Sequence, residues 1–259
     1  MTALIIENLV KQYKEKKIIE NLSFFVKKGE FFIITGPNGS GKTTIVKTLA
    51  GIINKTAGKV LIFNKDINKY KTKELALKIA FVAQQNFLDF SFYVKEIVLM
   101  GRFPHMNFLG MEKQKDIDIA EESMVFTGVD NLKNRAMESL SGGEQQRVFI
   151  ARSICQRSEI MILDEPTASL DISHQIRIME LLKKLKNKNR ITIIMVSHDL
   201  NLASMYADRI LLLKHGKIIK TGKPENVLKK DILEDVYDCR LYVDKTPSGN
   251  PRIIPAPLS

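Results

Sequence analysis

The chain has 259 residues, of which 44% are hydrophobic and 27% are charged, and it contains no low-complexity tract, which indicates a soluble globular protein. Its length allows one substantial core with a smaller lobe attached, and no apolar run approaches the roughly 18 residues that span a bilayer. The net charge of +11 comes from lysines spread along the chain, which favours a solvated surface over a compact basic arm for nucleic acid.

The N-terminal segment, MTALIIENLVKQYKEKK, lacks the basic start, apolar centre and small-residue cleavage site of a signal peptide. We therefore expect the chain to stay in the cytosol or on the cytosolic face of a membrane. The two cysteines, Cys155 and Cys239, have no metal-like spacing, and we interpret both as reduced and structural.

Short apolar runs alternate with helical patterns along most of the chain. The predicted strands cover residues 3–9, 18–26, 30–35, 59–63, 79–83, 160–163, 191–196 and 209–213. The predicted helices cover residues 42–50, 113–127, 144–156 and 173–187. Between residues 85 and 156 helical patterns dominate and strand-like runs disappear.

This order predicts an α/β fold with a mainly parallel sheet and an antiparallel β part at the N-terminus. We expect residues 1–84 and 157–230 to form the α/β core and residues 85–156 to form an inserted helical lobe. Residues 231–259 are expected to add a short C-terminal extension rich in proline (Pro247, Pro251, Pro255 and Pro257).

The segment GPNGSGKT follows an apolar strand and opens a helix, and it fits the pattern G-x-x-x-x-G-K-[ST]. Glycines let the backbone curl around a phosphate, while successive amides and the positive end of the helix face the anion. Lys42 would neutralise the β- and γ-phosphates of a nucleotide, and the Thr43 hydroxyl would bind Mg²⁺. The predicted phosphate-binding residues are Gly36, Pro37, Asn38, Gly39, Ser40, Gly41, Lys42, Thr43 and Thr44.

The stretch IMILDE places two acids after a strand that is apolar throughout. Such acids lie at the carboxyl end of the strand, where open α/β sheets bind ligands. Asp164 would hold Mg²⁺ directly or through water, and Glu165 would take a proton from the attacking water or orient it. An acid in this position is often a helix cap or a surface charge, but the phosphate loop favours the catalytic interpretation.

A second glycine pair opens the helix that begins in LSGGEQQR. Ser141 and Glu144 fit a capping box, which alone would make this an ordinary helix start. A helix that needs only a cap has no use for two glycines, however. We expect Gly142 and Gly143 to bare the first-turn amides, which with the Ser141 hydroxyl form a second anion site.

One chain thus carries two predicted phosphate-binding surfaces but only one set of Mg²⁺ and water residues. A symmetric dimer removes this mismatch, because the same patch then serves both subunits. The LSGG surface of one chain would cover the nucleotide held by the GPNGSGKT loop of the other, with two ATP molecules between them.

These motifs resemble those of ABC-type ATPases, the nucleotide-binding subunits of ABC transporters, in order and across most of the chain. LSGGEQQR is similar to the signature motif, with Glu144 where many members have glutamine. The resemblance implies that Tyr13 stacks on adenine and that Gln84 senses Mg²⁺ and the γ-phosphate. It also implies that Asp171 lies at the dimer interface and that His198 contacts the γ-phosphate. Taken singly, Tyr13, Gln84 and His198 have ordinary structural interpretations, and Gln85 could replace Gln84.

Two other classes of P-loop protein fit this sequence less well. Soluble ABC ATPases that act on nucleic acid or the ribosome usually carry two cassettes or a long coiled coil, whereas this chain has one phosphate loop, one signature and no sustained heptads. A P-loop kinase or GTPase would not need the LSGG segment. We therefore expect a transporter subunit that binds no nucleic acid and docks on integral membrane permease subunits, at the cytoplasmic face of the cell membrane.

The segment 86–110 favours docking because it contains six aromatics in a chain with 13 phenylalanines, 6 tyrosines and no tryptophan. These are Phe87, Phe90, Phe92, Tyr93, Phe103 and Phe108, and some of them must form the core of the helical lobe. An exposed apolar groove here would suit a short helix of a partner.

LMGRFPH with Phe108, Leu109 and Gly110, and the tail VYDCRLYVDKTPSGNPRIIP, resemble segments of ATPases from importers of iron-siderophore complexes, haem and cobalamin. The resemblance implies an importer that receives cargo from an extracytoplasmic binding protein. The residues do not choose among the three cargoes. We expect an iron complex because it is the most common cargo of the group.

Overall fold

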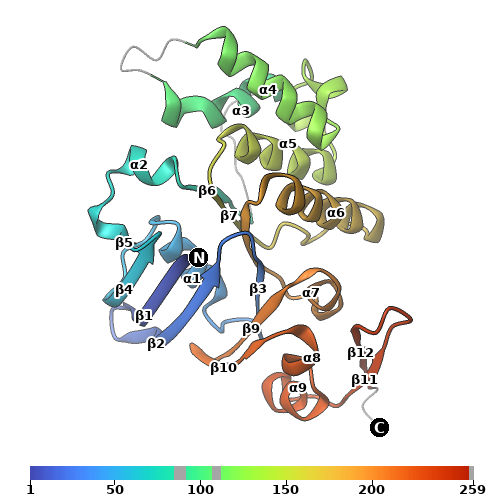
Figure 1. Ribbon diagram of the computed structural model, residues 1–259. Helices are drawn as coiled ribbons and strands as arrows, with labels where there is room; N and C mark the ends of the chain where they lie inside the picture. Colours follow the sequence, from blue (N-terminus) through green and yellow to red (C-terminus); the bar gives the residue numbers. More distant parts are fainter. Residues whose placement is uncertain (85–91, 107–111, 257–259) are drawn as a thin grey trace.

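A six-stranded sheet forms the centre of the computed structural model, which describes residues 1–84, 92–106 and 112–256 (Figure 1). The strand order is β10-β9-β3-β8-β7-β6, and all neighbours are parallel except β10, which pairs antiparallel with β9. The strands are β3 (Phe31–Thr35), β6 (Ile79–Val82), β7 (Ile160–Asp164), β8 (Thr192–Val196), β9 (Arg209–Lys214) and β10 (Lys217–Gly222). Every residue of β3, β7 and β8 is buried, as expected for parallel strands covered on both faces.

A second, antiparallel sheet has the strand order β2-β1-β4-β5 and covers one side of the core. Its strands are β1 (Thr2–Tyr13), β2 (Lys16–Lys27), β4 (Ala57–Ile62) and β5 (Lys65–Asp66). It is followed by the 3₁₀-helix η1 (Ile67–Lys69) and by α2 (Thr72–Ala76), which the sequence patterns did not predict. The mainly parallel sheet and the antiparallel N-terminal part are thus both confirmed.

Strand β3 separates two hydrophobic cores because its side chains alternate between the faces of the sheet. Phe32 and Ile34 pack with α1 (Lys42–Leu49) and the antiparallel sheet, whereas Phe31 and Ile33 pack on the opposite side with the helices. Both faces of the strand that leads into the phosphate loop are therefore fixed by apolar packing.

A layer of helices lies above the sheet (Figure 1). It contains α3 (Val94–Leu99), η2 (Met100–His105), α4 (Gln114–Thr127), η3 (Asp130–Leu132), η4 (Met137–Ser139) and α5 (Gly142–Cys155). Arg102 and Asp116 form a buried ion pair at 2.9 Å between η2 and α4, and Arg102 also donates to the Cys155 carbonyl at the end of α5. The described part of segment 85–156 is helical, as expected, while the exact limits of the lobe remain a prediction.

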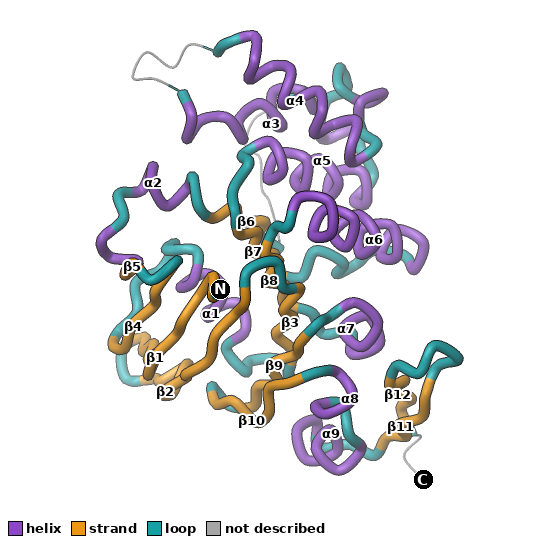
Figure 2. The backbone as a smooth tube through the Cα atoms, viewed as in Figure 1, coloured by secondary structure: helices purple, strands orange, loops and turns teal. Residues whose placement is uncertain are grey.

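Helix α6 (Ile172–Asn189) precedes β8, and α7 (Leu200–Tyr206) follows it. The C-terminal elements α8 (Pro224–Val227), α9 (Lys230–Tyr237), β11 (Leu241–Lys245) and β12 (Pro251–Pro255) lie together at one end of the molecule (Figure 2). The predicted proline-rich extension is therefore a helix followed by an antiparallel hairpin, with two of its prolines at the ends of β12. Among the described residues, no helix is both long and apolar enough to cross a membrane.

Candidate functional site

The glycine-rich loop after β3 takes a conformation that requires glycine at two points. Gly36 has a φ of 149°, and a Cβ there would lie 2.2 Å from the Leu213 carbonyl oxygen of β9. Gly41 has a φ of 97° and caps α1 in the left-handed region. The loop thereby delivers the chain into the first turn of α1, whose amides lack helical partners. The buried Ser40 hydroxyl has no hydrogen-bond partner among the described residues, which leaves an extra donor at this loop.

Lys42 is buried at the start of α1, and its ammonium donates hydrogen bonds to the loop's own carbonyls. The distances are 2.8 Å to the Gly36 oxygen and 3.0 Å to the Pro37 oxygen. Burial lowers the pKa of Lys42, and the nearby carboxylates of Glu165 and Asp164 oppose this shift. The carboxylates of Asp164 and Glu165, at the end of β7, thus offset the burial of this ammonium in part, and a phosphate in the loop would add a further anion.

Asp164 and Thr43, 121 residues apart in sequence, form one polar pair beneath the loop. The Thr43 hydroxyl donates to the Asp164 carboxylate at 3.1 Å, and Asp164 is only 1% exposed. Burial raises the pKa of Asp164, while the hydrogen bond from Thr43 lowers it. A hydroxyl beside a buried carboxylate is the oxygen donor set that Mg²⁺ prefers. No group of three His, Cys, Asp or Glu among the described residues could hold a metal, so Mg²⁺ here would need phosphate oxygens as further ligands.

Three predicted catalytic residues meet at one oxygen of Glu165. The Gln84 amide donates to Glu165 Oε2 at 2.8 Å, and His198 Nδ1 lies 3.6 Å from the same oxygen. Glu165 itself has a φ of 50°, a left-handed conformation that is uncommon for a residue with a side chain. Its amide donates to the Val196 carbonyl at 3.2 Å, which holds this turn against β8. Strained backbone held in this way is characteristic of functional sites.

Tyr13 is not joined to this cluster. Its ring is 47% exposed at the end of β1, and the Lys11 ammonium lies 4.6 Å from the ring centroid. The adjacent strand does approach the loop, because the Ile18 carbonyl lies 3.0 Å from the position of a Cβ on Gly41. Stacking of Tyr13 on adenine therefore remains a prediction, and Gln85, the alternative to Gln84, lies outside the described residues.

The capping box predicted in LSGGEQQR is present at the start of α5. The Ser141 hydroxyl accepts from the Glu144 amide, and the Glu144 carboxylate accepts from the Ser141 amide at 2.9 Å. The hydrogen bond from the Ser141 backbone holds the pKa of Glu144 below its usual range. No hydrogen bond between described residues joins Ser141, Gly142 or Gly143 to the phosphate loop, and their place in a second anion site stays a prediction.

The second glycine of the pair has a role that the sequence did not reveal. A Cβ on Gly143 would lie 2.4 Å from Cδ2 of His174 on α6, whereas one on Gly142 would meet nothing closer than 3.8 Å. His174 Nδ1 is in turn 2.9 Å from the carboxylate of Asp171, the residue that caps α6. Hydrogen bonds from the His174 amide, the imidazole and Ser173 hold the pKa of Asp171 well below its usual range. Close packing on α6 therefore explains Gly143 within a single chain, so bare amides are not its only reason.

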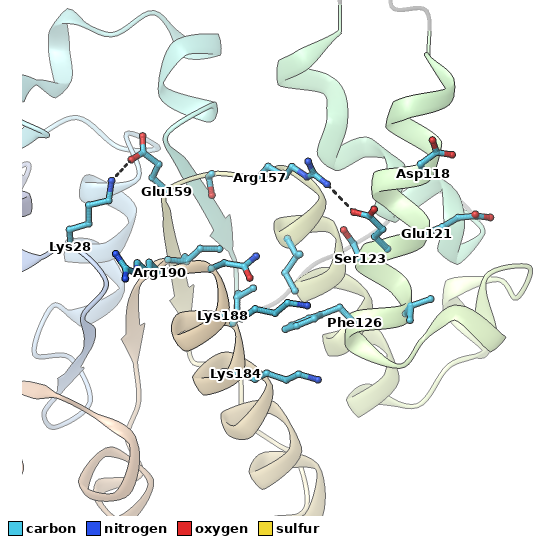
Figure 3. A pocket seen from close by; sticks show the side chains of 17 residues that line it. Lys28, Asp118, Glu121, Ser123, Phe126, Arg157, Glu159, Lys184, Lys188 and Arg190 are labelled. Carbon is cyan, nitrogen blue, oxygen red and sulfur yellow. Dashed lines mark hydrogen bonds and ion pairs between the residues drawn. The ribbon is translucent and has the colours of Figure 1, made fainter.

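A cavity of about 1430 Å³ lies away from this cluster (Figure 3). It opens beside Glu159 and Ile191, which precede β7 and β8, whereas Asp164 and Glu165 lie at the opposite end of β7. Its walls pair their own charges, with Lys28 on Glu159 at 3.0 Å and Arg157 on Glu122 at 2.9 Å. We assign no ligand to it.

These features define a P-loop nucleotide hydrolase: a parallel sheet with a phosphate loop, a buried Asp–Thr pair and a Gln–Glu–His cluster. Helix α5, which begins with two glycines, points to the ABC family within this class. The family described as ABC transporter matches residues 19–168. The chain belongs to this family, which makes it an ABC-type ATPase that binds ATP.

Similar proteins extend over the whole chain. The probable siderophore transport system ATP-binding protein YusV of Bacillus subtilis is 37% identical over 98% of this chain and 93% of that protein. A solved transporter assigned to the metal-chelate type, in an inward-facing conformation, has a chain 29% identical with a TM-score of 0.88, covering 98% of this chain and 97% of that one. A dimeric bacterial ABC transporter cassette is 32% identical with a TM-score of 0.77, covering 85% of this chain and 98% of that one.

The contact between α5 and α6 predicts unequal effects of alanine at the two glycines. Gly143→Ala should lower the free energy of unfolding by about 1–3 kcal/mol, because its methyl group must displace an imidazole that Asp171 holds. Gly142→Ala, the matched control, should be close to neutral. Denaturant unfolding of both variants measures the difference.

The double variant Gly143→Ala/His174→Ala should recover part of the lost stability, since the shortened side chain makes room for the methyl group. Equal destabilisation by alanine at positions 142 and 143, with no recovery in the double variant, would contradict this explanation of Gly143.

Proposed function

We propose that this chain is the ATP-hydrolysing subunit of an ABC importer that energises uptake of an iron complex of the siderophore type through a membrane permease. The observation that carries the hydrolytic part is the meeting of Gln84 and His198 at one oxygen of Glu165. The importer and its cargo rest on the 37% identity to a siderophore transport ATP-binding protein over nearly all of both chains. Haem and cobalamin are the alternative cargoes.

In this proposal the phosphates lie in the loop 36–43, where they replace the carbonyls that Lys42 contacts. The Lys42 ammonium neutralises the β- and γ-phosphates, and the bare amides at the start of α1 bind their oxygens. Thr43, Asp164 and Gln84 supply oxygen ligands for Mg²⁺, which when bound would neutralise charge on the phosphates.

The hydrolytic step needs a water aligned with the γ-phosphate. Glu165 is suited to orient this water or take its proton, because its side chain is only 15% exposed and its carboxylate accepts a hydrogen bond from Gln84. His198 lies on the more exposed side of the same oxygen and reaches the γ-phosphate from the loop after β8. Water is thus activated where three separate strands end.

We further propose that two copies close face to face on two ATP molecules. Ser141, Gly142 and Gly143 of one chain then complete the site formed by the loop of the other, and Asp171 lies at the same interface. Gly142 supports this assignment because it is exposed, and a Cβ there would meet only Leu170, at 3.8 Å. A dimeric cassette is also among the similar structures. Binding of ATP between the two chains would close the dimer, and hydrolysis of the ATP would reopen it.

The permease is proposed to dock on a groove between α3, η2 and α4, with a volume of about 850 Å³. Its apolar wall contains Phe92, Leu99, Met100, Phe103, Ile117, Ala120 and Met124, and its rim carries charges of both signs. Phe103 is 59% exposed and Tyr93 49% exposed, whereas Phe92 packs partly into the core. The other predicted docking aromatics, Phe87, Phe90 and Phe108, lie outside the described residues.

This groove fits a short amphipathic helix on the cytoplasmic side of a permease. Residues 85–91 connect it in sequence to Gln84, so nucleotide state at the Glu165 cluster has a direct route to the docking surface. The chain would then be peripheral to the membrane on its cytoplasmic face, and the extracytoplasmic binding protein would contact the permease alone.

Lys42→Ala should weaken ATP binding and lower the hydrolysis rate at least about 100-fold, because it removes the buried ammonium that would neutralise the β- and γ-phosphates. Lys59→Ala, on the exposed face of β4, removes the same charge away from the site and should leave turnover unchanged. Phosphate release and binding of a fluorescent ATP analogue measure both effects. Near-normal turnover of Lys42→Ala would refute the assigned phosphate site.

Glu165→Gln should bind ATP without hydrolysing it and accumulate as a dimer, because the closed state then has no route to reopen. Light scattering after size-exclusion chromatography with Mg-ATP measures the mass. Adding Ser141→Arg, which fills the second anion site with a large side chain, should restore the monomer. A Glu165→Gln variant that binds ATP yet stays monomeric would contradict the shared site.

Phe103→Asp should abolish capture of the permease by a tagged Glu165→Gln chain from detergent-solubilised native membranes, with partners identified by mass spectrometry. Val125→Asp is the control, since Val125 is 65% exposed on α4 outside the groove. Both variants should retain ATP hydrolysis in the Glu165 background. Capture of ribosomal or DNA-repair proteins instead of a polytopic membrane protein would overturn the importer assignment.

A further inference from the structure

The C-terminal segment, defined here as Lys230–Ala256, reaches the base of the phosphate loop. Tyr237 is the last residue of α9, and its hydroxyl lies 3.3 Å from Oγ1 of Thr35. Thr35 ends β3, is fully buried and directly precedes Gly36. A residue 202 positions along the chain thus contacts the point where the strand becomes the loop.

The same helix is tied to the strand on the other side of Gly36. Lys214, at the end of β9, forms an ion pair with Asp238 at 2.9 Å and also donates to the Asp235 carbonyl. Its neighbour Leu213 contributes the carbonyl that leaves no room for a Cβ on Gly36. Lys214 therefore links β9, which packs against Gly36, to the end of α9, which contacts Thr35.

The hairpin that follows α9 fixes the C-terminal segment at a second point. Asn201 on α7 exchanges two hydrogen bonds with the Ile253 backbone, at 3.1 and 2.8 Å, and Ser204 donates to the Pro251 carbonyl at 2.6 Å. Helix α7 begins after Asp199, which directly follows His198. With both ends anchored, α9 is a fixed support for Tyr237 and not a loose tail.

From this network we infer that Tyr237 is a positioning residue for the phosphate loop, through which the C-terminal segment sets the affinity for ATP. The inference rests on the proposed phosphate site. Gly36 has a φ of 149°, and glycine is free to take other backbone conformations at little cost, so contacts with neighbouring residues decide where the loop begins. The Tyr237 hydroxyl supplies such a contact at Thr35, the residue directly before the loop, where a small displacement moves every amide that follows.

Tyr237→Phe tests the inference, because it removes the hydroxyl and keeps the ring that packs beneath the sheet. The KM and Kd for ATP should rise about fivefold, the factor that corresponds to one hydrogen bond of roughly 1 kcal/mol, while kcat changes less than about twofold. Tyr242→Phe is the matched control, since Tyr242 lies on β11 of the same segment and is 58% exposed. It should leave the KM unchanged.

Thr35→Val and the double variant Thr35→Val/Tyr237→Phe complete a double-mutant cycle. Each single change should raise the Kd for ATP. The Kd of the double variant should not exceed that of the single variant with the higher Kd, because both changes remove the same contact. Thr35→Ser, which keeps the hydroxyl, should retain the wild-type Kd.

An unchanged Kd for ATP in Tyr237→Phe, with or without a lower unfolding temperature, would overturn the inference and leave a purely structural contact. An equal rise in Tyr242→Phe would overturn it too. These results are separable from failure of the phosphate site itself. If the phosphate site is wrongly assigned, Lys42→Ala will still hydrolyse ATP. If Lys42→Ala is inactive but Tyr237→Phe has the wild-type Kd for ATP, only the positioning role is refuted.

Discussion

The whole site depends on the parallel register of β3, β7 and β8. Val196 is level with both Ile34 and Asp164, so the three strands end together. Two backbone hydrogen bonds extend this ladder past the strand ends, from Glu165 to Val196 and from Ser197 to Ile34. Because all three strands are buried on both faces, a slip of one residue would exchange the side chains that fill the two cores and spoil their packing. The loop, the acidic pair and the histidine are thereby kept at one edge.

The sequence predicted this edge well because each part is local. GPNGSGKT, IMILDE and the strand before His198 each combine an apolar strand with the polar residues that follow it, and strand ends of a parallel sheet share an edge. The capping box at Ser141 is equally local. The contacts that sequence reasoning missed join distant segments, such as Tyr237 with Thr35 and His174 with Gly143. No periodicity or spacing records them, and only a histidine three residues after the Asp171 cap hinted at the second pair.

The site also buries one positive and one negative charge, and this burial favours the binding of an anion together with a cation. Burial disfavours the charged form of Lys42, and the Asp164 carboxylate is likewise shielded from water. The two charges offset the cost of each other's burial only in part, because Lys42 donates its hydrogen bonds to loop carbonyls and Asp164 accepts one from Thr43. A phosphate accompanied by Mg²⁺ would supply an anion to the lysine and a cation to the aspartate at once. Nucleotide and metal are therefore expected to bind together better than either binds alone.

The two glycine-opened helix starts are held by different parts of the chain, and this difference matters for the proposed dimer. The start of α1 is fixed by the sheet, while the start of α5 packs through Gly143 on His174, which is bound to Asp171. Only residues 166–170 separate Asp171 from Glu165. A nucleotide from the partner chain that moved the start of α5 would therefore press on the same short segment that carries Glu165. In the proposed dimer, this geometry would link engagement of one chain's ATP to the Glu165 carboxylate that acts on the other ATP, without any element outside the cassette.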